Sequence, residues 1–464
     1  MITGHSEPVG SGRSRVPYAA VERGEATQRR DARFALIVLG IAVVGLIVRV
    51  AYVVFVKRYD ALIADEKYYY YQSRWLAEGY GFVVAPGSHV PSALHPPLPS
   101  ILLAPSAWIG WGDAVLSERL FLALVGAVTV FVVGYLGREV AGKRVGYVAA
   151  GLAAIAPGIW INDGIIMSEP FSVLCVALLL LLTFRFLKRP TLWGIFGMGV
   201  VTGLGILTRG ELLLLVPFVI IPAIIAKRAD GWQQGIVRLA AAGVGTLLFV
   251  APWVGYNLSR FQEPLFVSGN LGGVICGANN PTAYYGPETG MWILNGCPFP
   301  KSAPDQSVLD HYFQDRGLDY MRDHAGRLPV VMVKRVARTW EVYAPTQMVD
   351  FLETEGRPRW ISWTALVTLV ILLPFVVGGV VVLRRRKLPC WPLVSVIGYV
   401  TFAGMIFGGN PRYRVPGEIA IVVLAAVAID ALIGPRARDD VGAEDVSGLA
   451  DAEPVDGDRQ ALVE

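Results

Sequence analysis

The chain has 464 residues, of which 54% are hydrophobic and only 17% are charged, and its formal net charge is +4. A soluble protein of this length needs more charged surface, so the composition excludes an ordinary soluble globular fold. The slight positive charge comes from short basic loops between apolar runs, and it gives no indication of nucleic-acid binding.

The N-terminal part of the chain is polar and is followed by long apolar runs. Residues 1–33 contain no apolar core, so we predict a disordered cytoplasmic tail without a cleaved signal peptide, and the first span acts as a signal anchor. A helix of about 20 apolar residues crosses a bilayer. The sequence predicts ten spans, at 34–56, 117–137, 145–162, 168–187, 191–207, 211–226, 236–257, 361–383, 390–408 and 416–434.

Basic residues orient the predicted spans. Arg138, Lys143 and Arg144 follow the second span, and similar clusters lie at 185–189, 227–238 and 384–387. Short loops rich in lysine and arginine stay in the cytoplasm. Both termini are therefore predicted to be cytoplasmic.

The remaining segments complete the domain prediction. The prolines within 96–112 disfavour a regular span there, so this stretch is expected to be interfacial or half-inserted. The polar, acidic C-terminal tail is expected to be disordered. The expected units are the tail 1–33, a transmembrane module 34–260 that includes the outer loop 57–116, an extracytoplasmic segment 258–360, C-terminal spans 361–434 and a cytoplasmic tail 435–464.

Asp65 and Glu66 open an aromatic stretch just outside the first span. Tyr68, Tyr71 and Trp75 follow at helical spacing, which predicts a short helix in the membrane interface. A carboxylate at that depth can act as a general base on a hydroxyl group. Alternatively, the acidic pair caps the N-terminus of that helix, where the helix dipole favours negative charge. Capping and catalysis are compatible roles.

Two further clusters lie at the same outer depth. His95 precedes two prolines on a rigid backbone, where it can contact a phosphate or a hydroxyl group or remain solvated. Arg119 enters the second span, and guanidinium matches phosphate geometry. An ion pair with Glu118 or another acid, or snorkelling to headgroups, is the alternative role for Arg119.

The last two clusters add acids and arginines. Asp163 and Glu169 lie between the third and fourth spans, where Glu169 also suits a helix start. Arg209, Arg412 and Arg414 violate the positive-inside trend, which favours contact with an anion over simple contact with headgroups. Outer acids and arginines above an apolar bundle suit an amphiphile with an anionic head, such as a lipid-linked phosphosugar.

Cysteine placement predicts one disulfide. Cys276 and Cys297 lie in the extracytoplasmic segment, where a disulfide can form, and free thiols are the alternative.

The order of these motifs resembles a known family. Asp65-Glu66 with Tyr68 to Tyr71, His95-Pro96-Pro97, Glu118-Arg119-Leu120, Ser168-Glu169-Pro170, Leu207-Thr208-Arg209 and Arg412-Tyr413-Arg414 resemble the polyprenyl-phosphate-dependent glycosyltransferases of the GT-C fold. Bacterial relatives of protein O-mannosyltransferase and of the aminoarabinose transferase are the nearest in pattern. The resemblance covers roughly residues 34–260 and 400–430.

The resemblance implies an all-α polytopic membrane fold of about ten transmembrane helices with interfacial helices and one larger outer loop. It implies transfer of a sugar such as mannose or arabinose from a polyprenyl phosphate to a hydroxyl group of a glycan, glycolipid or protein, at the outer face of the cytoplasmic membrane. Asp65 would be the catalytic carboxylate, with Glu66 beside it. The phosphate would contact residues Arg119, His95, Arg209, Arg412 and Arg414, and the substrate would contact Tyr68, Tyr69, Glu169 and Asp163.

Several alternatives stay open at this point. A transporter or flippase of a lipid-linked sugar also places charge in a membrane protein, although its charges would lie nearer mid-membrane. A non-catalytic envelope-assembly subunit is the third class. Some membrane glycosyltransferases use a divalent cation, but no ligand spacing in this sequence demands a metal. The Ala, Val, Gly and Arg content is typical of a high-GC organism such as an actinobacterium.

Overall fold

The computed structural model describes residues 18–109 and 113–434, and helices dominate them. No strand forms in these residues, where Val83 and Pro91 make an isolated β-bridge. The long helices are α1 (Tyr18–Tyr52), α4 (Ala114–Ala141), α5 (Lys143–Ile155), α7 (Glu169–Lys188), α8 (Leu192–Ile206), α10 (Trp232–Leu258), α16 (Arg359–Arg385), α17 (Trp391–Phe407) and α18 (Glu418–Leu432). The others are α2 (Asp65–Ala77), α3 (Leu98–Leu103), α6 (Pro157–Trp160), α9 (Ile221–Ile225), α11 (Leu271–Ala278), α12 (Pro281–Tyr284), α13 (Gln306–Asp323), α14 (Leu328–Thr339) and α15 (Pro345–Thr354).

The helices form a multi-pass membrane bundle. Six described helices are long and apolar enough to cross a bilayer, and the bent pair Lys143–Ile155 and Pro157–Gly164 makes a seventh. The other three predicted spans are shorter apolar helices, at Leu192–Ile206, Gly210–Ile225 and Trp391–Phe407. The predicted all-α polytopic class is therefore confirmed, with an approximate helix count.

Proline explains the two irregular spans. Pro157 has no backbone N–H and cannot continue α5, and the chain bends there by 55°. Pro217 and Pro222 likewise divide the run 211–226 into a 3₁₀ turn, a π turn and α9. The hydropathy pattern gives the position of such segments but does not show these breaks.

Helix α18 lies at the centre of the bundle. Every residue from Ile419 to Val427 is buried, and α18 packs against α16, α5 and α4. A helix that is apolar on all sides is stable only where neighbours surround it. By contrast, α1 and α10 leave most of their apolar surface on the outside, as expected for helices that face lipid.

Glycines let two of the helices approach closely. On α8, Gly199 lies against the carbonyl of Ala242, and Gly203 lies against the carbonyl of Thr246 on α10. A Cβ at either glycine would collide with that backbone. Small residues four positions apart are typical of membrane helix pairs, where close packing replaces the hydrophobic effect.

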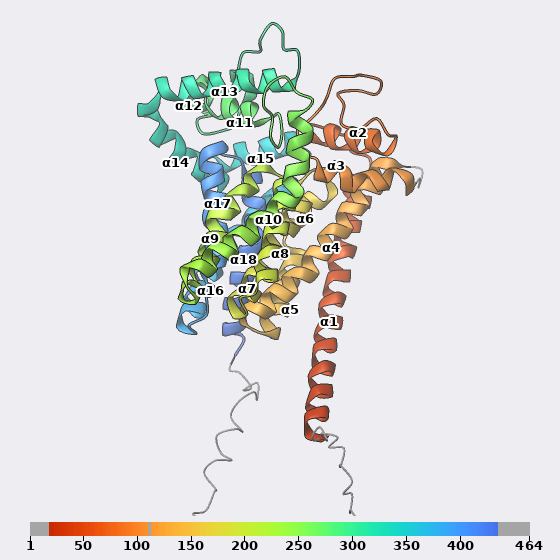
Figure 1. Cartoon of the computed structure of the whole chain (residues 1–464), viewed down its shortest axis with the longest axis vertical. Helices are drawn as coiled ribbons and strands as arrows, with labels where there is room; N and C mark the ends of the chain where they lie inside the picture. The colour runs from red at the N-terminus through yellow and green to blue at the C-terminus, as the bar shows by residue number, and fades with distance from the viewer. Residues whose placement is uncertain (1–17, 110–112, 435–464) are drawn as a thin grey trace, which may run out of the picture.

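The short helices gather at one end of the bundle. Figure 1 shows α2, α11, α12 and α13 at the end of the molecule opposite the α4–α5 junction. The segment between α10 and α16 supplies α11 to α15, and the segment between α1 and α4 supplies α2 and α3. We call these two segments, with helices α2, α3 and α11 to α15, the cap.

Two predicted segments need a correction or lie outside the described residues. The predicted tail 1–33 is helical from Tyr18, because the polar stretch before the first span contains good helix formers and extends α1. Residues 1–17 and the predicted acidic tail 435–464 lie outside the described residues.

Candidate active site

A cavity of about 700 Å³ lies between the bundle and the cap. The start of α2, the loop at His95, the turn after α8, helices α11, α13 and α15, and the segment after α17 all contribute to its wall. Five of the residues that the sequence predicts for the site line the cavity: Asp65, Tyr69, His95, Arg209 and Arg412.

Asp65 is the first residue of α2 and faces this cavity. The residue before it, Ala64, has a φ of 45°, which is rare for a residue with a side chain and turns the chain sharply into the helix. The Asp65 side chain is 31% exposed. Its Oδ1 lies 3.5 Å from Nε2 of His95, and its Oδ2 accepts a hydrogen bond of 3.0 Å from Nη1 of Arg412.

The charges around Asp65 keep it ionised. Burial raises the pKa of its carboxyl, but the opposing charges and hydrogen bonds of His95 and Arg412 are stronger and hold that pKa well below its usual range. At neutral pH Asp65 is therefore a carboxylate, and it becomes more basic when Arg412 weakens its hydrogen bond.

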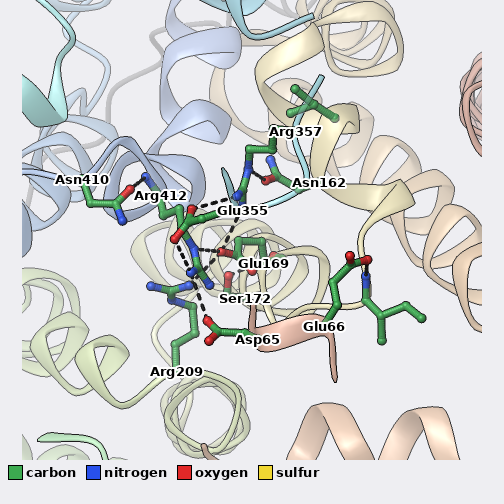
Figure 2. Close-up of polar contacts among 12 residues, drawn as sticks. Asp65, Glu66, Asn162, Glu169, Ser172, Arg209, Glu355, Arg357, Asn410 and Arg412 are labelled. Carbon is green, nitrogen blue, oxygen red and sulfur yellow. Dashed lines mark hydrogen bonds and ion pairs between the residues drawn. The ribbon is translucent and has the colours of Figure 1, made fainter. Parts of the chain in front are cut away.

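Glu169 lies at the centre of a buried network of charges, which Figure 2 shows. It is fully buried at the start of α7, and its Oε1 accepts hydrogen bonds from Arg209 (3.1 Å), Arg412 (2.6 Å) and Arg357 (3.3 Å). Glu355 accepts from Arg412 at 2.9 Å and from Arg357 at 3.0 Å. Each buried charge thus has an opposite partner, as burial in a membrane protein requires.

Two guanidinium groups of the cavity wall each keep one nitrogen without a hydrogen bond to the described residues. Arg209 bonds Glu211 through Nε and Glu169 through Nη1, and Arg412 uses Nε and Nη1 as described. Within the described part of the chain, no hydrogen bond uses Nη2 of either residue, and neither Nη2 is among the buried polar atoms without a partner. Since both side chains line the cavity, these two Nη2 groups are available to an anion.

Aromatic rings position His95. Its ring stacks on Tyr69 at 5.1 Å and meets Tyr68 edge-on at 4.9 Å. Burial raises the pKa of Tyr68 to about 12 and raises that of Tyr69 further, so both tyrosines stay neutral. Tyr69 lines the cavity, whereas Tyr68 supports the imidazole from outside the lining.

Glu66 and Arg119 do not line the cavity, so the structure does not bring these two predicted site residues together with Asp65. Glu66 is fully buried and accepts from Arg119 Nη2 at 3.3 Å and from the Ile166 amide at 3.1 Å. Arg119 also donates to the carbonyls of Lys57 and Asp60. Successive helix residues point about 100° apart, so only one of two adjacent acids faces the cavity. Figure 2 shows Glu66 apart from the network around Glu169.

Three more predicted site residues lie outside the cavity lining. Asp163 is buried in an ion pair of 2.6 Å with Arg49 of α1. Arg414 lies between Glu341 and Glu418, at 2.8 Å and 3.0 Å. Glu169 contacts the cavity only through its arginines. All three residues are charged, and the sequence predicts that they lie at the outer ends of spans. Their charges are paired with other side chains, and a sequence does not reveal such pairing.

Two network members, Glu355 and Arg357, are absent from the sequence prediction. They follow α15 and precede α16, at the same end of the bundle as Arg209 and Arg412. The criterion that singled out Arg209 and Arg412, an arginine at the outer end of a span, applies equally to Arg357.

The donor set does not fit a resident metal ion. Within residues 18–109 and 113–434, no three His, Cys, Asp or Glu side chains come close enough to hold one. The carboxylates of Asp65, Glu169 and Glu355 all contact Arg412, and Arg209 and Arg357 add further positive charge to Glu169 and Glu355. A divalent cation would need these oxygens free.

The predicted pair Cys276 and Cys297 is joined by a disulfide in the cap. It links α11 to the segment that follows Trp292, close to the cavity.

Comparison with a family model agrees with the predicted resemblance. Residues 94–256 match the model described as dolichyl-phosphate-mannose-protein mannosyltransferase. This match confirms, over those residues, the resemblance inferred from the motifs. No curated protein sequence matches the chain.

Two solved structures of one archaeal enzyme are similar to this chain in fold. The Archaeoglobus fulgidus oligosaccharyltransferase AglB, in complex with an inhibitory peptide and a dolichol-phosphate, superposes with a TM-score of 0.50 and 15% identity over 92% of this chain and 52% of that one. The same enzyme tethered to an acceptor peptide gives a TM-score of 0.50 and 14% identity over 85% and 49%. ArnT from Cupriavidus metallidurans bound to undecaprenyl phosphate gives a TM-score of 0.40 and 16% identity over 86% and 78%. The chain spans about half the length of the archaeal enzyme, and the likeness is one of fold.

Proposed function

We propose that this membrane protein is a glycosyltransferase that moves a sugar from a polyprenyl phosphate to a hydroxyl acceptor. The observation that carries the proposal is the joint placement of an ionised carboxylate, Asp65, and two guanidinium groups, Arg209 and Arg412, on the wall of one cavity. The family match supports the reaction class, because its description names a lipid-phosphate sugar donor.

Asp65 is the proposed general base. It takes the proton from the acceptor hydroxyl as that oxygen bonds to the anomeric carbon of the sugar. The bond between the anomeric carbon and the phosphate oxygen breaks, and the polyprenyl phosphate leaves with the electron pair. Asp65 then returns its proton to water. One displacement of this kind inverts the anomeric carbon, and no covalent sugar intermediate is needed.

Arg209 and Arg412 are the proposed phosphate ligands. Both side chains line the cavity, and guanidinium donors stabilise the charge that develops on a leaving phosphate. As Arg412 turns toward the phosphate, it releases Asp65 and makes this carboxylate more basic. His95 lies beside Asp65 and is placed to contact the donor as well.

The apolar side of the cavity suits the lipid part of the donor. Leu213, Leu214 and Phe407 line it next to the arginines. Leu213 is 56% exposed, so the cavity wall offers open apolar surface to a ligand. A dolichol-phosphate accompanies the similar archaeal structure, and we carry that ligand class to this cavity as part of the proposal.

The cavity is proposed to open on the outer face of the cytoplasmic membrane, with both termini inside. Arg138 and Lys143 lie at the far end of α4 and at the start of α5, away from the cap. Short basic loops remain cytoplasmic, so the cap with Asp65 faces out. The acceptor then reaches Asp65 from outside the cell.

Turnover of defined donors by the purified protein in nanodiscs tests this function. Decaprenyl-phosphate mannose and decaprenyl-phosphate arabinose are the donors, and a neutral octyl glycoside is the acceptor. We expect release of decaprenyl phosphate and a product of inverted anomeric configuration. Movement of intact donor between leaflets without cleavage would instead indicate a flippase, and a retained configuration would contradict the single displacement.

A further inference from the structure

The cavity has two chemically different ends. Of the described residues that line it, Arg209 and Arg412 are the only arginines or lysines, and both belong to the end next to the bundle. The opposite wall is formed by α11, α13 and Trp292 and carries aliphatic, carboxylate, amide, imidazole and aromatic side chains. We call this surface the cap wall.

The cap wall is held rigidly. Gly272 on α11 lies so close to the Asp310 carbonyl of α13 that a Cβ would collide with it. The Trp292 indole lies over Gly277, and its Nε1 donates to the Gly273 carbonyl at 3.2 Å. The disulfide between Cys276 and Cys297 joins α11 to the segment that carries Trp292. A ligand would meet a surface whose groups are already positioned.

Hydrogen bonds within the cap wall leave specific atoms unused. Asp310 accepts from the Gly272 amide at 2.6 Å and from Gln314 Nε2 at 2.8 Å, so its two oxygens are engaged. His311 Nδ1 contacts the Ser307 carbonyl at 3.0 Å. Among the described residues, no hydrogen bond uses Gln314 Oε1 or His311 Nε2, and both side chains line the cavity. The Trp292 N–H is occupied, so its indole offers aromatic surface.

We propose that the cap wall is the acceptor subsite and that its ligand is a neutral carbohydrate. This inference rests on the proposed function, in which Asp65 deprotonates a hydroxyl group that enters the same cavity. An aromatic surface beside amide and imidazole groups complements the apolar face and the hydroxyl groups of a sugar ring. The absence of a lysine or arginine from the described cap wall suits an uncharged acceptor.

A peptide acceptor fits the cap wall less well. Extended peptides are often held by the edge of a sheet, and the cap's described residues contain no strand. Asp310, the charged residue of this wall, already accepts hydrogen bonds from Gly272 and Gln314. We therefore assign the acceptor to the carbohydrate class and treat transfer to protein as the competing outcome.

Gln314→Ala and Trp292→Phe test the assignment in the full-length protein in nanodiscs. One measurement is the ratio of transfer onto octyl mannobioside to transfer onto water, using decaprenyl-phosphate mannose and decaprenyl-phosphate arabinose as donors. Loss of one hydrogen bond between neutral groups weakens binding by roughly 3- to 10-fold. We therefore expect the ratio of transfer onto octyl mannobioside to transfer onto water to fall by about that factor in Gln314→Ala. Asp315→Ala, an exposed change on the same helix, serves as the matched control and keeps the wild-type ratio.

Binding separates failure of this inference from failure of the proposed function. Saturation-transfer NMR with octyl mannobioside needs no turnover, and we expect its signal to weaken in Gln314→Ala. Binding that depends on Gln314, without turnover of either donor, would keep the subsite and refute the transferase. A wild-type ratio and wild-type binding in both variants would overturn the subsite, as would preferred glycosylation of a threonine-rich peptide over octyl mannobioside.

Discussion

Arg412 donates a hydrogen bond from Nη1 to Oδ2 of Asp65 over 3.0 Å, although the two residues are 347 positions apart in the chain. The same guanidinium contacts Glu169 and Glu355. Arg412 therefore joins the proposed base on α2 to the start of α7 and the end of α15. A donor phosphate competes with Asp65 for this group, so donor binding and activation of the base are coupled.

Replacement of Arg412 by lysine tests this coupling. An ammonium group keeps the charge but cannot hold three carboxylates and a phosphate in a planar fork. We expect kcat/KM for the donor to fall by at least about 10-fold, with the thermal stability little changed because Glu169 retains Arg209 and Arg357. Steady-state transfer and thermal denaturation of Arg412→Lys check this, and unaltered kcat/KM would show that the fork is dispensable.

Replacement of His95 by glutamine tests the protonation state of Asp65. Burial raises the pKa of Asp65, and His95 is the first of the groups that lower it, so His95→Gln lets that pKa rise. In the wild type the Asp65 carboxyl stays ionised at pH values below the ordinary aspartate pKa of about 3.9. The folding stability that its ion pairs contribute is present above that pH and is lost as the pH falls below it.

The acid limb of the pH–rate profile is the measurement. It should lie at higher pH in His95→Gln than in the wild type. His89→Gln changes an exposed histidine of the same outer segment and should leave the limb in place. An acid limb that does not move in His95→Gln would show that His95 does not control Asp65.

Truncation of Arg119 tests whether this residue stabilises the fold or binds the donor phosphate. Arg119→Ala leaves the carboxylate of Glu66 buried without its partner, which typically costs about 3–5 kcal/mol. We expect a lower denaturation temperature and a wild-type KM for the donor in the folded fraction. The double variant with Glu66→Gln should recover part of the stability. A raised donor KM at wild-type stability would restore the phosphate-binding role that the sequence predicts.

Removal of the disulfide tests the support of the cap wall. The bond closes a loop between residues 21 positions apart, and its loss typically costs about 3 kcal/mol. Cys276→Ser with Cys297→Ser should lower the denaturation temperature, whereas Cys175→Ala, which removes a free thiol, should not. Equal stability of the two proteins would show that the packing of Gly272 alone holds α11 on α13.

The sequence predicts the bundle well because hydropathy and charge act locally along the chain. It also identifies Asp65, His95, Arg209 and Arg412, since each is a polar group in a segment outside the predicted spans. It cannot decide which outer charges pair with each other. Arg119, Asp163 and Arg414 have the same local signature as Arg412, but their partners come from remote segments and lie away from the cavity. Glu355 and Arg357 reach the site only through the folding of the cap.

The rate of sugar transfer by Asp65→Asn is the most direct test of the proposed mechanism. Asparagine keeps the size of the side chain but cannot accept the proton. We predict a fall in kcat of about 10²- to 10⁴-fold, with polyprenyl phosphate still bound in native mass spectrometry. Transfer at the wild-type rate by a folded Asp65→Asn protein would contradict the assignment of Asp65 as the base.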